Sequence, residues 1–281
     1  MDTFFLQIAQ KLSEAKIENP QWETRLIFAE VLQKSPSEIF LTTSPTIAEI
    51  KKINHITEQR LRHKPLDKIF GHRGFYKYDF FISEDVLSPR PDTEILVESA
   101  LEILPIISRP NILDLGCGSG CIIETLLKEN PLASGCAVDI SAQALSMAKK
   151  NAKALAIDKQ LKFINADWFA EDFTLQIGKK FDMIVSNPPY IPSAEIETLT
   201  TEVKKYDPLE ALDGGATGFE SYERIAEIAP ILLRNNGYIL LEAGYNQARQ
   251  IVDIFTTHGF NLLKIVNDLA GIERCVVLQL D

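Results

Sequence analysis

Cysteine is scarce in this chain, with four residues among 281. Four are too few, in a chain of this length, for the disulfide framework that holds small secreted domains together. Long apolar runs are also missing, and the first residues lack the basic and apolar regions of a secretory signal. We therefore expect a cytoplasmic protein that has no membrane partner.

Basic residues are outnumbered, because 29 lysines and arginines face 39 aspartates and glutamates and leave a net charge of −10. An acidic surface repels a phosphate backbone, although a local basic patch can persist within an acidic average. We therefore expect no direct binding of nucleic acid. The four histidines are scattered, and Cys117 and Cys121 have no further metal-type ligand nearby in the sequence, so we expect no metal site.

The N-terminal part, residues 1–71, has the pattern of a small helical domain. Its apolar residues recur at spacings of three and four, first at Phe5, Ile8 and Leu12 and then at Trp22, Leu26 and Ala29. Aromatic and β-branched residues follow, and we interpret residues 72–88 as a β-hairpin that links two domains. The composition is average for a globular protein, and the length favours two domains.

Residues 89–281 alternate between apolar strands and helical segments. This alternation predicts a doubly wound, mostly parallel α/β sheet of the Rossmann-like class, with helices on both faces. In such a sheet, ligands bind at the carboxyl ends of the strands, where the strand order reverses. The strands are expected at residues 111–115, 135–140, 161–165, 181–186, 237–242 and 275–280.

A glycine-rich turn follows the first of these strands and opens a helix. Glycines allow positive φ and let a ligand approach the backbone closely. The spacing is Gly-x-Gly-x-Gly, unlike the Gly-x-Gly-x-x-Gly of dinucleotide binders, and a helix N-terminus can hold a carboxylate as well as a phosphate. We therefore expect S-adenosyl-L-methionine (SAM) here, with an ordinary tight turn as the alternative. The turn comprises Gly116, Cys117, Gly118, Ser119 and Gly120.

Acidic and aromatic residues follow the next two strands. Asp139 ends the second strand, where a carboxylate can accept hydrogen bonds from both hydroxyls of a ribose. Asp167 and Trp168 follow the third strand and could meet the amine and the ring of adenine. For Trp168, simple packing in a loop is the alternative. Together, the glycine turn and Asp139 favour SAM more strongly than the glycines do alone.

A second motif, Asn-Pro-Pro-Tyr, follows the strand at 181–186. Its prolines stiffen the turn and have no N–H to donate, so the motif offers acceptors, namely a side-chain amide oxygen and a backbone carbonyl. Acceptors suit a planar NH₂ group, whereas an oxyanion hole needs donors. The motif therefore predicts methylation of a conjugated amine or amide, and a turn that merely closes the strand is the alternative. Its residues are Asn187, Pro188, Pro189 and Tyr190, the last of which offers a ring face to a planar group.

With these motifs the chain resembles, over nearly its whole length, the HemK/PrmC family of glutamine amide N-methyltransferases that modify peptide-chain release factors. Asn-Pro-Pro-Tyr is shared with methyltransferases of DNA and RNA amines, whereas Pro-Arg-Pro-Asp-Thr-Glu at residues 89–94 is more specific. Asp67, Cys117 and Asp92 depart from the residues usual in the family. The matching segments are residues 64–66, 69–71, 87–94, 114–120, 138–141, 184–191, 207–212, 214–215 and 268–271.

The resemblance implies a seven-stranded SAM-methyltransferase domain at residues 89–281, and a helical domain that recognises the substrate. It implies that residues 187–190 hold the glutamine amide of the Gly-Gly-Gln loop of class 1 release factors. It also implies that the glycine turn binds SAM together with Asp139, Asp167, Trp168 and Asn187. We expect a monomer. Two other classes stay open: a DNA or RNA amine methyltransferase, which the acidic charge disfavours, and a non-enzymatic SAM-binding or dinucleotide-binding module, in which Asn-Pro-Pro-Tyr would have no purpose.

Two charged features have structural interpretations. Arg90 lies between two prolines, and we favour a salt-bridge anchor over a guide for the substrate. The acidic run Glu195, Glu197 and Glu202 is interpreted as a solvated face, with attraction of a basic partner as the alternative.

Overall fold

The computed structural model describes residues 2–39 and 44–281. The chain divides into two compact units. The helical unit consists of Met1–Gly71 with Thr200–Tyr206, and the sheet unit consists of His72–Leu199 with Asp207–Asp281. Among the described residues, no helix combines the length and the hydropathy that crossing a bilayer requires.

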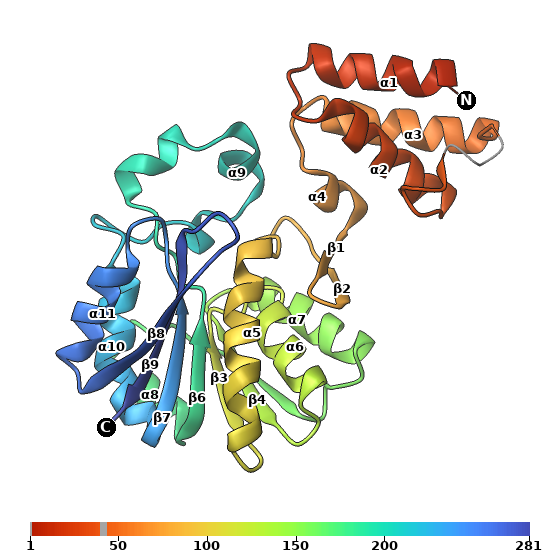
Figure 1. Ribbon diagram of the computed structural model, residues 1–281. Coiled ribbons are helices and arrows are strands. Elements are labelled where there is room, and N and C mark those ends of the chain that lie inside the picture. The colour runs from red at the N-terminus through yellow and green to blue at the C-terminus, as the bar shows by residue number, and fades with distance from the viewer. Residues whose placement is uncertain (1, 40–43) are drawn as a thin grey trace. The chain divides into compact units, whose positions relative to one another are not determined.

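The helical unit buries one apolar face of each of its main helices. Its helices are α1 (Asp2–Glu14), α2 (Pro20–Leu32), α3 (Ile47–Arg60), α4 (Leu66–Phe70) and α9 (Thr201–Tyr206) (Figure 1). The predicted face of α1 is confirmed, since Phe5, Ile8 and Leu12 are all buried. The predicted face of α2 is confirmed only in part, because Ala29 is buried whereas Trp22 is 50% exposed. Phe28 takes the central position instead, with its ring 5.4 Å from that of Phe5.

A buried arginine closes the helical unit. Arg60 is 3% exposed, and its Nε donates to Glu23 Oε2 at 2.6 Å. Its Nη2 donates to Glu202 Oε1, also at 2.6 Å. The Oη of Tyr206 donates to the carbonyl of Arg62 at 3.0 Å. These bonds bring α9 into the helical unit, so the expectation of a solvated acidic face is wrong for Glu202.

The sheet unit contains a mostly parallel seven-stranded sheet in the order β5-β4-β3-β6-β7-β9-β8 (Figure 1). β9 is antiparallel to both of its neighbours. The six expected strands are present, and β8 is the strand that the sequence pattern did not reveal. The strands are β3 (Asn111–Leu115), β4 (Ser134–Asp139), β5 (Leu161–Asn165), β6 (Phe181–Ser186), β7 (Leu233–Glu242), β8 (Phe260–Asn267) and β9 (Glu273–Leu280).

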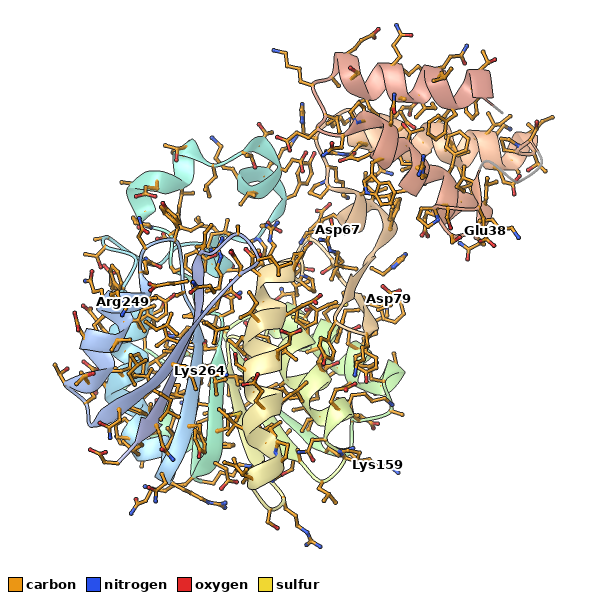
Figure 2. All side chains as sticks on the ribbon, viewed as in Figure 1. Glu38, Asp67, Asp79, Lys159, Arg249 and Lys264 are labelled. Atoms are coloured by element: carbon orange, nitrogen blue, oxygen red, sulfur yellow. The ribbon has the colours of Figure 1, made fainter. Side chains whose placement is uncertain are left out.

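Helices cover both faces of this sheet, as Figure 1 shows. Alternate strand residues point to opposite faces, so Ile112 packs in one core cluster and Leu113 in the other. Helices α5 (Glu94–Ile103), α6 (Cys121–Glu129) and α7 (Ala142–Ala154) cover the first face, and α8 (Phe173–Ile177), α10 (Glu220–Leu232) and α11 (Ala248–Thr256) cover the second. Lys264 lies on β8 (Figure 2). It forms an ion pair with Glu102 of α5.

Short elements complete the unit. The hairpin of β1 (His72–Phe75) and β2 (Tyr78–Phe81) is antiparallel and shorter than the predicted span of 72–88. Phe75 and Phe80 of this hairpin are buried in the first core cluster. Four turns of 3₁₀ helix are η2 (Pro91–Thr93), η3 (Leu104–Ile106), η4 (Ser193–Thr198) and η5 (Leu209–Ala211).

Two carboxyl groups, those of Asp114 and Glu124, are enclosed completely in this unit. Glu124 of α6 is 0% exposed, and neither of its side-chain oxygens has a hydrogen-bond partner among the described residues. Burial, and to a lesser extent the nearby charge of Asp114, raise the pKa of Glu124 to about 10. The folded protein therefore holds a proton on Glu124 that the unfolded chain releases above its ordinary pKa of 4.5.

This proton makes the stability depend on pH. Because the pKa is raised on folding, the contribution is fully present at low pH and is lost as the pH rises. Between pH 5 and pH 7, Glu124 should account for a loss of about 2–3 kcal/mol in the free energy of unfolding. Urea denaturation at both pH values should show that Glu124→Gln lacks this part of the loss. The exposed control Glu98→Gln should show the full loss. If the free energy of unfolding fell by the same amount between pH 5 and pH 7 in both variants, the assignment would be contradicted.

Candidate active site

A cleft of about 380 Å³ opens in the sheet unit. It lies at the carboxyl ends of β3, β4, β5 and β6, where the strand order reverses between β3 and β6. The volume falls in the range of small-molecule sites. Several of the predicted site residues line it together, namely Gly116, Gly118, Asp139, Asp167, Trp168, Asn187 and Pro189.

The glycine turn forms one wall of the cleft. Gly116, Gly118 and Gly120 all have positive φ, at 76°, 54° and 84°. A Cβ on Gly116 would lie 3.0 Å from the ring of Trp168, whereas a Cβ on Gly118 would meet nothing within 4 Å. Gly118 therefore leaves open space in the wall, and Gly116 allows the indole to come close. Cys117 and Ser119 are buried, and neither they nor Gly120 line the cleft.

Asp139 joins the end of β4 to the glycine turn. Its Oδ2 accepts from the N–H of Gly118 at 2.8 Å, and its Oδ1 accepts from the N–H of Ser141 at 2.9 Å. The side chain is 8% exposed, and burial raises its pKa although both hydrogen bonds lower it. Each carboxylate oxygen has a second lone pair, so the group can still accept hydrogen bonds from a ligand.

Trp168 and Asp167 follow β5 and line the cleft side by side. Asp167 is exposed, and its Oδ1 accepts from the N–H of Phe169 at 2.8 Å. The indole Nε1 of Trp168 is buried and has no partner among the described residues. Arg224 of α10 donates through Nε to the carbonyl of Trp168 at 2.8 Å and so braces this loop. Trp168 lines the cleft with its ring, and an indole there suits contact with the ring of a nucleoside.

The Asn-Pro-Pro-Tyr turn forms the opposite wall. The Nδ2 of Asn187 donates to Thr93 Oγ1 at 3.3 Å, and Pro189 lines the cleft. Pro188 is buried, and Tyr190 is largely enclosed. Burial, followed by the charge of Glu242, raises the pKa of Tyr190 to about 12, so its phenol stays neutral. Pro188 and Tyr190 do not line the cleft as it stands.

Segments distant in the sequence support this turn, and the sequence motifs did not predict them as site residues. The Nε2 of Gln247 donates to the carbonyl of Tyr190 at 3.1 Å. Three glycines, at 214, 218 and 244, pack against the turn without side chains: a Cβ on Gly214 would lie 2.7 Å from Tyr190 Cα. The Gly-Gly pair at 214–215 is among the segments that resemble the family, so the sequence could have pointed to it. No sequence pattern marks Gln247.

Ion pairs fix the segment that brings Thr93 to the site. Arg90 Nη2 donates to Asp207 Oδ2 at 2.8 Å, which confirms the interpretation of Arg90 as an anchor. Asp92 pairs with Arg274 of β9 at 3.2 Å. Both pairs lie within the sheet unit: Arg90 directly precedes the 3₁₀ turn η2, and Asp92 lies within it.

Gly214→Ala should distort the turn. The φ of Gly214 is not positive, but an added Cβ would lie under 3.0 Å from Tyr190 Cα and C and from the Pro189 carbonyl, all of which are backbone atoms. The turn must therefore shift, and we expect the catalytic rate at this site to fall at least tenfold, because misplacement of about 1 Å can cost a factor of about 100. The control is Gly74→Ala, where a Cβ meets nothing within 4 Å. Initial-rate assays that give equal rates for both variants would contradict this account.

Two family models match the chain. The model described as "Methyltransferase small domain" matches residues 91–204, and the model described as "PrmC N-terminal domain" matches residues 5–71. Among solved structures, the ribosomal protein L11 methylase of Lactobacillus delbrueckii subsp. bulgaricus has a TM-score of 0.50 at 17% identity. This likeness covers 70% of this chain and 82% of that one, and it concerns the fold alone.

Curated relatives match over nearly the full length. The release factor glutamine methyltransferase of Rhodospirillum rubrum is 40% identical over 273 residues, which cover 96% of this chain and 82% of the relative. The release factor glutamine methyltransferase of Agrobacterium fabrum is 38% identical over 276 residues, which cover 96% of this chain and 94% of the relative. With 40% identity to a relative covered over four fifths of its length, the chain belongs to the release factor glutamine methyltransferase family and is a SAM-dependent methyltransferase.

Proposed function

We propose that this enzyme transfers the methyl group of SAM to the side-chain amide nitrogen of the glutamine in the Gly-Gly-Gln loop of class 1 release factors. One observation carries the proposal. The NH₂ of Asn187 is turned to Thr93, and the prolines have no N–H, so the turn offers the cleft acceptors. Acceptors fit an amide NH₂, and the names of the relatives point to glutamine as its source.

The chemistry follows from the weakness of an amide nucleophile. Resonance draws the nitrogen lone pair into the carbonyl, so the nitrogen attacks poorly unless it is positioned and polarised. The Asn187 oxygen and the Pro188 carbonyl would accept the two amide hydrogens and aim the nitrogen at the methyl group. Positioning of this kind can lower a barrier by about 7–11 kcal/mol. The new N–C bond replaces the S–C bond of the sulfonium, and one amide proton then leaves to solvent.

The opposite wall of the cleft would hold SAM. Asp139 would accept from the ribose hydroxyls, Trp168 would contact adenine, and Asp167 would accept from its amine. Gly116 and Gly118 would leave room for the amino-acid end, while Cys117, Ser119 and Gly120 would shape the turn from behind it. The open space at Gly118 and the place of Trp168 in the wall of the cleft support this arrangement. SAM, when bound, supplies the electrophilic methyl group.

Asp139→Asn should weaken SAM binding by about 1–3 kcal/mol, because it replaces an acceptor for ribose hydroxyls with a donor. Calorimetry with SAM would measure the change. Asp182→Asn is the matched control, since Asp182 also accepts from a backbone N–H, that of Asn111 at 2.8 Å, but begins β6 at the end of the sheet away from the cleft. Unchanged affinity in Asp139→Asn, or equal losses in both variants, would contradict the proposed ribose site.

The helical unit would recognise the folded release factor. An acceptor pocket can hold one carboxamide but cannot select one glutamine among many, so selection needs contacts outside the cleft. Trp22 offers such a contact, because it is half exposed and stacks with Arg25, whose guanidinium carbon lies 5.8 Å from the ring centre. Exposed tryptophans are frequent anchors of protein interfaces. We further propose a cytoplasmic monomer that makes no direct contact with nucleic acid.

Intact release factor should be methylated much faster than a Gly-Gly-Gln peptide at equal concentration. Trp22→Ala should lower kcat/KM for the intact factor about tenfold and leave the rate on the peptide unchanged, because only the intact factor reaches the helical unit. Leu175→Ala is the control, since Leu175 is 82% exposed on the sheet unit.

Labelled SAM and mass spectrometry would measure these rates, with DNA and rRNA as alternative substrates. Equal rates on peptide and intact factor would refute the role of the helical unit. Methylation of DNA or rRNA in place of the factor would overturn the proposed substrate.

A further inference from the structure

The side chain of Asn187 is held by two residues outside its own motif. Its Nδ2 donates to Oγ1 of Thr93, the last residue of η2, at 3.3 Å. The carboxylate of Glu242, the last residue of β7, lies beside both side chains, and its buried Oε2 has no hydrogen-bond partner among the described residues. Thr93 is 2% exposed and Glu242 is 3% exposed, so both groups lie away from bulk solvent behind Asn187, which lines the cleft.

The direction of donation follows from which groups can donate. A carboxylate only accepts, so the single hydroxyl proton of Thr93 is available to Glu242, while the Thr93 oxygen accepts from Asn187. The NH₂ of Asn187 gives one hydrogen to Thr93 and has a second one for Glu242. The Asn187 oxygen is then the group left for a substrate.

We propose that Glu242 and Thr93 are positioning residues for methyl transfer: they hold Asn187 with its amide oxygen toward the substrate NH₂. The inference rests on the proposed role of Asn187 in binding the glutamine amide. The negative charge of Glu242 also polarises the Asn187 amide through the N–H bond, which makes its oxygen a stronger acceptor. A substrate nitrogen whose hydrogens are held more firmly keeps more electron density for attack on the methyl group.

The surroundings of Glu242 make its charge sensitive to pH. Burial raises its pKa to about 7, against the hydrogen bonds from Thr93 and Asn187 and the charge of Arg274, which lower it. The pKa values of the neighbouring tyrosines and thiols are raised by burial, so these groups stay neutral near pH 7. The groups that face Glu242 are Asp92 of η2, Arg274 and Cys275 of β9, Tyr190 of the turn, Tyr222 of α10 and Cys121 of α6.

Protonation of Glu242 should switch the arrangement off. A protonated carboxyl carries an O–H donor and loses acceptor capacity, so Asn187 is no longer fixed in one orientation. The rate at saturating SAM should therefore fall as the pH drops through about 7. No loss from this group is expected as the pH rises, because its charged form is the active one.

The test compares five proteins on intact release factor: wild type, Glu242→Gln, Thr93→Val, Thr93→Ser and Thr125→Val. kcat is measured from pH 5.5 to 9 at saturating SAM, and SAM affinity is measured by calorimetry. Thr125→Val is the matched control, because Thr125 is also a buried threonine, but its hydroxyl bonds to the carbonyl of Cys121 in its own helix.

Glu242→Gln should lower kcat at pH 8 at least tenfold, leave SAM affinity within twofold, and abolish the acid limb of the pH profile. Thr93→Val should lower kcat and move the acid limb to higher pH, because the Thr93 bond that lowers the pKa of Glu242 is gone. Thr93→Ser keeps the hydroxyl and should restore both, and Thr125→Val should behave as wild type. Thr93→Val provides the test by itself if Glu242→Gln does not fold.

A wild-type acid limb in Glu242→Gln would overturn the inference alone, as would a Thr93→Ser variant no better than Thr93→Val. A loss of kcat matched by an equal loss of SAM affinity would show a general structural role and would also overturn it. A wild-type protein that methylates no release factor would overturn the proposed function, and the inference with it.

Discussion

Two adjacent prolines at the end of β6 impose the constraint on which the site depends. Pro188 and Pro189 have no N–H, so the turn cannot brace itself with the backbone hydrogen bonds that hold most turns. The support comes from other segments of the chain. Thr93 accepts a hydrogen bond from the side-chain amide of Asn187, which precedes the prolines, and Gln247 donates one to the carbonyl of Tyr190, which follows them. Because these donors are missing, the turn offers mainly acceptors, and residues from other segments are needed to stabilise it.

The same constraint explains why glycines crowd behind the turn. Backbone from the loops at 213–218 and 244–247 must come within contact distance of residues 189–190, which leaves no room for a Cβ at Gly214. The bond from Gly214 N–H to the Ile191 carbonyl and the bond from Ile191 N–H to the Leu212 carbonyl then lock the two segments together. Rigidity at this wall comes from packed main chain.

Sequence patterns predict the parts of the molecule in which function follows from local order. The strands that end at the cleft have regular apolar content, and the glycine turn and Asn-Pro-Pro-Tyr are contiguous motifs. The sequence pattern did not predict β8, because β8 is an edge strand whose alternation is broken by a register shift between Leu262 and Lys264. The burial of Trp22 in α2 was predicted wrongly, because two adjacent faces of this helix carry apolar residues and periodicity alone does not show which of them packs in the core. Glu242 and Thr93 meet only through strand order and helix packing, which no local pattern encodes.

The helical unit has a consequence for how the chain is made. Arg60 lies 142 positions before Glu202, and its first partner, Glu23, lies 37 positions before it. During synthesis at about 5–20 residues per second, Arg60 therefore waits on the order of ten seconds for its second carboxylate. In that interval Arg60 has Glu23 as its only carboxylate partner of the two, and β3 to β6 are synthesised before α9. The N-terminal helices thus acquire their last ionic partner only after the first four strands of the sheet have been synthesised.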